Sequence, residues 1–238
     1  QVGAQTNNVL SAYDLRQLRE DDGWMTDSLI HYAVAHYSGA RGDLHNGVAW
    51  YAPSLVKSGK DGDEEAFTNS LGAALGDVDP FDQDNAALPG NANVLLFPVN
   101  TEDTHWSLLA FYKADRTFVH YDSLGQSNDG AARALLTRLH ETGYLLADNA
   151  VFTRPPEVVP QVDGYNCGLY VTQFARKIME TGRKLTGLEI GQITSQSSDV
   201  LRGQIADAQT ELQRAAEAQA PGAAEIADLR RRMEDTTP

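Results

Sequence analysis

Apolar side chains recur three and four positions apart in seven stretches of the chain, several of them closed by a glycine. This spacing places the apolar residues on one side of an α-helix, and a glycine after the last of them is typical of a helix end. Leu29, Ile30, Ala33 and Val34 illustrate the pattern, and Gly39 follows them. We therefore predict helices over residues 10–18, 28–37, 63–76, 131–141, 168–179, 201–216 and 223–233.

The centre of the chain has the pattern of β-strands instead. The apolar run 94–99 predicts a buried strand that ends near Pro98, because proline lacks the N–H that a sheet requires. Three further strands are predicted over 105–112, 117–122 and 149–153.

A short turn at 113–116 predicts that the strands on either side of it form an antiparallel hairpin. The numbers of residues that face each other across such a hairpin have a constant sum, here roughly 228–230. This register places His105 within a couple of positions of the residue opposite Asp122. Because neighbouring side chains on one sheet face can touch, the hairpin alone can bring His105 and Asp122 together.

The order of these elements indicates the α+β class, with a central mixed sheet flanked by helices. The length of 238 residues allows one large domain or two small ones. We predict a main domain over 1–192 and a helical extension over 193–238, which packs on the domain or is partly disordered.

The composition narrows the range of partners. The formal net charge of −14 argues against a nucleic-acid ligand and suits a basic partner surface, although such charge commonly serves only solubility. A single cysteine forbids an internal disulfide and fits a reducing compartment. We expect no signal peptide and no membrane span, and a start without Met suggests an excised domain.

The one cysteine, Cys167, lies between a tight turn and a predicted helix. Gly164 and Asn166 precede it in the turn, and the helical pattern begins directly after it. The unpaired N–H groups and positive dipole at a helix start favour a thiolate. A lone cysteine is more often a buried, inert side chain, but this position favours a nucleophile.

A thiol nucleophile requires a base within hydrogen-bond reach and a group that orients the base. The chain offers His105 as the base and Asp122 as the orienting acid. Acyl transfer also requires donors for the oxyanion, which the backbone N–H of Cys167 and the carboxamide of Gln161 can supply. Taken singly, each side chain has an ordinary structural explanation, so the hypothesis depends on their joint placement.

Three sequence blocks resemble one family. The blocks are His105-Trp106-Ser107-Leu108, Tyr121-Asp122-Ser123-Leu124, and Gln161-x-x-Gly164-Tyr165-Asn166-Cys167-Gly168-Leu169-Tyr170-Val171. In this order they resemble the Ulp1 and SENP cysteine proteases, which release SUMO and related ubiquitin-like modifiers. Upstream, Trp24-Met25-Thr26-Asp27 resembles the family's Trp-Leu-Asn-Asp helix start. The resemblance covers about Leu15 to Thr181 and implies a papain-like fold with the cysteine at a helix N-terminus.

The resemblance implies a role for each matching residue. Cys167 would be the nucleophile, His105 the base, Asp122 its orienting acid and Gln161 the oxyanion donor. The implied substrate-binding residues are Trp24, Asp27, Trp106 and Gly164. Trp24 and Trp106 would enclose a narrow tunnel, which selects Gly-Gly because only glycine has no side chain to clash with two indoles. On the bare sequence, Trp24 could equally be a core aromatic, and Thr26 or Asp27 could be a helix N-cap.

The chain departs from the family in four places, the mildest being Met25 and Thr26 in place of Leu and Asn. Asn166 replaces the aspartate that usually precedes the cysteine, and neither the acidic segment 57–90 nor the tail 193–238 matches the family pattern. Compact members of the family occur as bacterial effectors delivered into eukaryotic cells, and the Ala/Gln-rich tail is compatible with that origin. We therefore expect a reducing intracellular compartment, the cytosol or nucleus, or a host cell if the protein is such an effector.

The leading hypothesis is a thiol protease that cleaves after the C-terminal Gly-Gly of SUMO, in conjugates or in precursors. The alternative modifier is ubiquitin or NEDD8, since a tunnel recognises only the C-terminal Gly-Gly and does not distinguish the surfaces of different modifiers. A Cys-His acetyltransferase of a related clan and a catalytically silent binding module remain open. We expect SUMO or a related modifier and its conjugates as partners, no nucleic acid, no membrane, a monomer, and neither cofactor nor metal.

Overall fold

The computed structural model of the chain describes residues 10–37, 44–45, 47–51, 92–101, 104–141 and 150–219. The predicted helices over 63–76 and 223–233 lie outside the described residues, as does the acidic segment 57–90. The described ranges contain the three sequence blocks around His105, Asp122 and Cys167.

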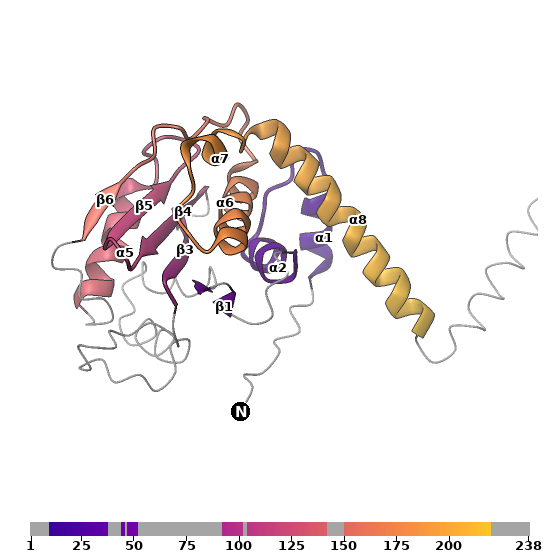
Figure 1. Ribbon diagram of the computed structural model, residues 1–238. Coiled ribbons are helices and arrows are strands. Elements are labelled where there is room, and N and C mark those ends of the chain that lie inside the picture. The colour runs from indigo at the N-terminus through magenta and orange to yellow at the C-terminus, as the bar shows by residue number, and fades with distance from the viewer. Residues whose placement is uncertain are drawn as a thin grey trace, which may run out of the picture.

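A six-stranded mixed sheet forms the centre of the molecule, with the strands in chain order (Figure 1). The β1–β2, β3–β4 and β4–β5 pairs are antiparallel, and the β2–β3 and β5–β6 pairs are parallel. The strands are β1 (Leu44–His45), β2 (Val48–Trp50), β3 (Val94–Thr101), β4 (His105–Tyr112), β5 (Thr117–Tyr121) and β6 (Val151–Thr153).

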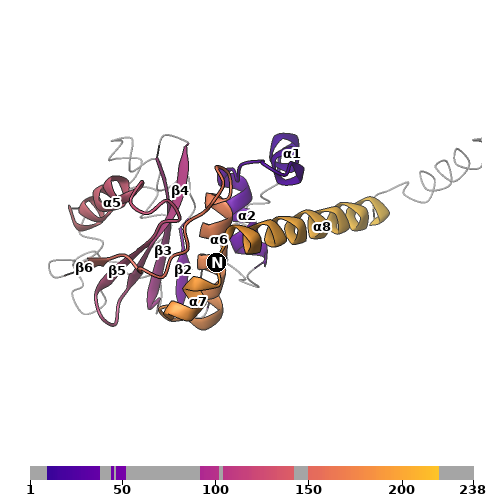
Figure 2. The ribbon, with the colours of Figure 1, turned by 90° about the horizontal axis from the view of Figure 1, so that it is seen from above.

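Helices cover both faces of the sheet, which confirms the α+β prediction. In Figure 2 α5 lies on one side of the sheet, and α6, α2 and α8 lie on the other. The helices are α1 (Ala12–Arg19), α2 (Asp27–Tyr37), α5 (Asp129–Glu141), α6 (Cys167–Thr181), α7 (Gly187–Gly191) and α8 (Ser195–Gln219).

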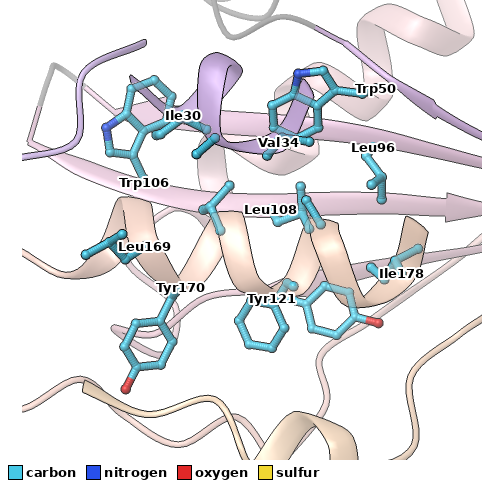
Figure 3. Close-up of a cluster of buried hydrophobic side chains, with 14 of the residues drawn as sticks. Ile30, Val34, Trp50, Leu96, Trp106, Leu108, Tyr121, Leu169, Tyr170 and Ile178 are labelled. Carbon is cyan, nitrogen blue, oxygen red and sulfur yellow. The ribbon is translucent and has the colours of Figure 1, made fainter. Parts of the chain in front are cut away.

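The alternation of side chains along the strands separates two apolar cores. On one face Phe97, Phe111 and Phe118 pack with the buried stripe of α5. On the other face Leu108 and its neighbours pack against α6 and α2 (Figure 3). Every residue of β4 is buried because both faces of this strand are covered.

The predicted hairpin is confirmed, together with its register. Leu108 faces Tyr121 and Tyr112 faces Thr117, so the paired residue numbers add to 229. The prediction that β3 ends near Pro98 is wrong, since the strand continues to Thr101. The Leu96 carbonyl accepts a hydrogen bond from Tyr51 of the β2 side, so Pro98, two residues on, also points its nitrogen toward β2. The described part of β2 ends before that level, so among the described residues no strand partner faces the missing N–H.

Polar caps fix the helix starts that frame the site. The Thr26 hydroxyl accepts a hydrogen bond from the Leu29 N–H at 3.2 Å and donates to Asp14 at 2.6 Å. Thr26 is therefore the residue that caps α2. At the other end of the motif region, Gly182 ends α6 in the left-handed conformation with φ 66°, as its sequence position predicts.

The long helix α8 joins the core through its first half. Leu201 and Ile205 are buried in the same apolar core as α6. Figure 1 shows the rest of α8 running away from the sheet past α1. Among the described residues, no helix has the length and apolar character needed to cross a membrane.

Candidate active site

Three element ends bring the predicted catalytic residues together. His105 begins β4, Asp122 directly follows β5, and Cys167 begins α6. The Nε2 atom of His105 lies 2.6 Å from Oδ1 of Asp122. All three residues are at most 4% exposed, so water is largely excluded from the group.

The surroundings of His105 favour its charged form. Burial lowers its pKa, but the hydrogen bond to Asp122 and the nearby Cys167 side chain outweigh burial and raise the pKa to about 9. The other ring nitrogen, Nδ1, is buried and has no partner of full hydrogen-bond geometry in the described part of the chain. Nδ1 is thus the atom available to exchange a proton with the thiol.

Asp122 is held as a carboxylate. Burial raises its pKa, but hydrogen bonds from His105 and from backbone N–H groups lower it below its ordinary value. The backbone N–H of Leu124 donates to Oδ1 at 2.8 Å, and that of Asn128 donates to Oδ2 at 3.0 Å. The acid therefore accepts three hydrogen bonds in a fixed orientation.

The turn before Cys167 is ordered by Asp163. Its carboxylate accepts hydrogen bonds from the backbone N–H groups of Tyr165 and Asn166, at 3.1 and 2.8 Å. Asn166 is fully buried at the N-cap position of α6, yet its side chain does not cap the helix. The turn thus presents Cys167 at the open end of α6, where the first N–H groups lack intrahelical partners.

The structure explains why asparagine replaces aspartate at position 166. The Asn166 amide donates to the carboxylates of Asp163 and Asp199, at 3.2 and 2.9 Å. A carboxylate at 166 would face both of these negative charges without a proton to share. The carboxylates of Asp163 and Asp199 therefore favour a neutral side chain at position 166.

An anchor that sequence reasoning missed is Arg202 of α8. It is 6% exposed and donates to the carbonyls of Gln17 and Glu20 and to Oδ1 of Asn166, at 3.1, 3.4 and 3.4 Å. Arg202 therefore connects α8 to the end of α1 and to the turn before Cys167. An arginine within an amphipathic helix carries no sequence signal for this role.

Gln161 is hydrogen-bonded to Ser123, the residue after Asp122. Its Oε1 accepts from the Ser123 hydroxyl at 2.6 Å, and its Nε2 donates to the Asp163 carbonyl at 2.8 Å. An amide nitrogen carries two hydrogens, so one N–H of Gln161 remains for a further acceptor.

Trp106 is hydrogen-bonded to the backbone next to Trp24. Trp106 is buried, and its Nε1 donates to the carbonyl of Met25 at 2.9 Å. Trp24, the residue before Met25, is 36% exposed, which contradicts the alternative that it is an ordinary core aromatic. Figure 3 shows Trp106 beside Ile30 of α2.

Gly168 allows Met25 to approach the residue after Cys167. A Cβ atom at Gly168 would lie 2.4 Å from Cβ of Met25, which is closer than two carbon atoms can pack. The absence of a side chain at 168 therefore lets Met25 lie against the start of α6.

We predict that Gly168→Ala lowers the free energy of unfolding by about 1–3 kcal/mol, because the added methyl overpacks the contact with Met25. Urea unfolding measures the change. Gly203→Ala in α8 is the matched control, since nothing lies within 4 Å of its Cβ position, and we expect it to be neutral or stabilising. Equal effects of both variants would contradict the close-packing explanation.

Two other predicted site residues lie near the surface. Asp27 is the first residue of α2 and half-buried. Gly164 is exposed, and open space surrounds its Cβ position, so no protein atom requires glycine there. No cluster of three or more potential metal ligands occurs within the described ranges.

We predict an alkaline limit near pH 9 for catalysis. As the predicted general acid, the His105 imidazolium would protonate the leaving group, and its pKa of about 9 marks where that proton is lost. The rate constant kcat measured from pH 6 to 10.5 tests this limit, and a limit near 6.5 would contradict the ion pair between His105 and Asp122.

The stability of the fold should depend on pH through the same group. Because the folded pKa of His105 lies above the unfolded value of 6.5, the stability from His105 is fully present below pH 6.5 and is lost as pH rises through about 9.

Comparison with known proteins defines the class. The model of the Ulp1 protease family, C-terminal catalytic domain, matches residues 73–216. Arabidopsis thaliana NEDD8-specific protease 1 is 33% identical over 37% of this chain and 42% of the relative, so that match spans under half of the relative's length. Human sentrin-specific protease 8 is 28% identical over 68% of this chain and 77% of the relative.

Solved structures show the same fold. A de-sumoylating protease aligns with TM-score 0.64 and 14% identity, covering 88% of both chains. The Ulp1 protease domain in complex with Smt3, the yeast ortholog of SUMO, aligns with TM-score 0.59 and 15% identity, covering 83% of this chain and 80% of that one. The Xanthomonas campestris effector XopD, bound to ubiquitin, aligns with TM-score 0.53 and 19% identity, covering 76% and 90%.

The family model, together with the fold that the solved structures share, defines the class of Ulp1-type cysteine proteases. The chain belongs to the Ulp1 protease family. The family match extends to residue 216, beyond the limit at Thr181 that the sequence motifs indicate, and so includes most of α8.

Proposed function

We propose that this protein cleaves the bond after the C-terminal Gly-Gly of a ubiquitin-like modifier, with Cys167, His105 and Asp122 as the triad and Gln161 as an oxyanion donor. The observation that carries the proposal is the buried His105–Asp122 pair at 2.6 Å, with the Cys167 side chain close enough to raise the pKa of His105. This arrangement matches the requirements of a thiol nucleophile, its base and an orienting acid.

The mechanism follows from this geometry. The Cys167 thiolate attacks the carbonyl carbon of the last glycine, and the oxyanion receives hydrogen bonds from the Cys167 backbone N–H and the free N–H of Gln161. Nδ1–H of the His105 imidazolium protonates the leaving amine as the C–N bond breaks, which leaves a thioester. His105 then takes a proton from water, the resulting hydroxide attacks the thioester, and the thiolate is regenerated.

The tryptophan pair supports selection of Gly-Gly. Trp106 is fixed by its bond to the Met25 carbonyl, and the neighbouring Trp24 is partly exposed at the same stretch of backbone. A passage between two indoles accepts residues without side chains before the scissile bond.

The modifier is proposed to be NEDD8 or SUMO. NEDD8 is favoured by the 33% identity to the Arabidopsis NEDD8-specific protease 1. SUMO is the modifier that the sequence motifs predict. It is also the partner in the yeast structure, but at 15% identity that likeness supports the fold alone. We expect the protein to act as a monomer in a reducing compartment, and delivery as a bacterial effector remains a proposal.

A panel of modifiers with a C-terminal electrophile in place of the last glycine tests the function. We expect a covalent adduct with NEDD8 or SUMO that forms at Cys167 and is absent with Cys167→Ala. An adduct with ubiquitin alone would reassign the modifier. No adduct from the folded protein would overturn the protease proposal and favour an acetyltransferase or a silent binding module.

A further inference from the structure

A second network of buried polar groups lies in the sheet behind the catalytic dyad. The Ser107 hydroxyl lies 2.9 Å from Nε2 of His120, and Nδ1 of His120 lies 2.8 Å from Oδ1 of Asp129. Ser107 and His120 are each 1% exposed, so no substrate reaches this Ser-His-Asp row. Its function must therefore be exerted through other residues.

The end groups limit the directions of the hydrogen bonds in the row. The Asn128 amide nitrogen lies 3.0 Å from the Ser107 oxygen and can only donate to it. Burial lowers the pKa of His120, against the raising effect of Asp129, and so favours its neutral form. In that form Nδ1–H of His120 donates to the Asp129 carboxylate, and the Ser107 hydroxyl donates to Nε2 of His120.

Asn128 connects this row to the catalytic site. Its backbone N–H donates to Oδ2 of Asp122 at 3.0 Å. Its side-chain nitrogen also lies 3.1 Å from the carbonyl of His105 and 3.2 Å from that of Val99. One residue that is 1% exposed thus contacts the acid, the backbone of the base and the neighbouring strand.

The outer end of the row is anchored by charge. Oδ2 of Asp129 accepts a hydrogen bond from Arg154 at 2.5 Å, at the position where α5 begins. The Asn128 carbonyl in turn accepts from the N–H of Ala132 in the first turn of α5. The row therefore links the start of α5 to the start of β4.

We propose that Asn128 is a positioning residue for the His105–Asp122 pair, and that Ser107, His120 and Asp129 hold its amide in the orientation this requires. Asn128 sets where the Asp122 carboxylate and the His105 backbone lie, and it touches no reacting atom. The inference concerns the same site as the proposed function and rests on that function only for its kinetic readout.

Titration of His105 followed by NMR in the full chain tests the proposal without any modifier. Asn128→Ala keeps the backbone N–H but removes the amide, so the Asp122 contact loosens and the pKa of His105 falls from about 9 toward 6.5. With a substrate made from the modifier that the wild type cleaves, we expect kcat to fall up to about 100-fold, because small misplacements of a catalytic group have effects of that size. KM should change by less than about threefold, since substrate contacts are untouched.

Tyr112→Phe is the matched control. It removes a buried hydroxyl that lies 3.1 Å from the Tyr121 hydroxyl at the opposite end of β4. We expect this variant to lower the thermal midpoint while leaving the His105 titration and kcat unchanged, which separates positioning from general destabilisation.

Two results would overturn the proposal. One is a folded Asn128→Ala protein whose His105 titration and kcat equal those of the wild type.

The other comes from Ser107→Ala, which tests the proposal if Asn128→Ala does not fold. This variant keeps Asn128 and removes only its link to His120. We expect Ser107→Ala to lower kcat roughly 3- to 10-fold and to shift the His105 titration downward, and an unchanged titration would exclude the role. Absence of cleavage by the wild type would refute the proposed function while the titration still tests the inference.

Discussion

Replacing Cys167 with alanine should reduce cleavage by about 10⁴-fold or more, because loss of the nucleophile leaves only binding and oxyanion stabilisation. Cys167 is the single cysteine of the chain, so no other thiol can take over its role. The assay measures, in a single turnover, release of the group attached to the C-terminus of the modifier that forms the adduct. Far-UV circular dichroism confirms that the variant is folded.

The same variant should still bind the modifier. Alanine removes one sulfur atom from a 1% exposed position and leaves the turn at Asp163 and the Trp106–Met25 bond in place. We expect the dissociation constant for the modifier to change by less than about threefold, measured by calorimetry. Retention of activity by Cys167→Ala would show that the nucleophile is assigned wrongly.

Replacing Asp122 with asparagine should lower kcat by about 10³–10⁴-fold although the side chain keeps its size. The carboxylate accepts hydrogen bonds from His105, Leu124 N–H and Asn128 N–H, which are all donors when His105 is charged. An amide has one acceptor oxygen, so its nitrogen would face a donor. The pKa of His105 should therefore fall from about 9, and the alkaline limit of kcat should move to lower pH.

Asp115→Asn provides the control for this charge change. Asp115 forms an ion pair with Lys184 at 2.6 Å on the surface, with its side chain 52% exposed. We expect Asp115→Asn to leave kcat and its pH profile unchanged, because exposed ion pairs are weak and this one lies far along β5 from the site. An Asp122→Asn protein with the wild-type alkaline limit would refute the orienting role of Asp122.

Local sequence rules were sufficient where the relevant contacts are local. The hairpin register follows from the four-residue turn, so the nearness of His105 and Asp122 could be predicted before any tertiary contact was known. The position of Cys167 at a helix start follows from the Gly-rich turn and the helical pattern after it. These are the features that the motifs encode in short, continuous segments.

The residues that hold the site in position could not be predicted from the sequence in the same way. Asn128 is one polar residue in a turn, and only the folded sheet shows that it contacts Val99, His105 and Asp122. The reason for Asn166 required the acids Asp163 and Asp199, which come from the turn and from α8. Hydrogen bonds between residues distant in the chain leave no periodic pattern.

The sequence by itself determined the α+β class and the hairpin, and it predicted the catalytic residues, because periodicity, turn length and residue type act over a few positions. The tertiary structure decided how these residues are held. Packing set Met25 against Gly168, next to Cys167, and it brought Arg202 from α8 to the turn before Cys167. Such contacts depend on burial and on the distances between whole elements, which only the folded chain specifies.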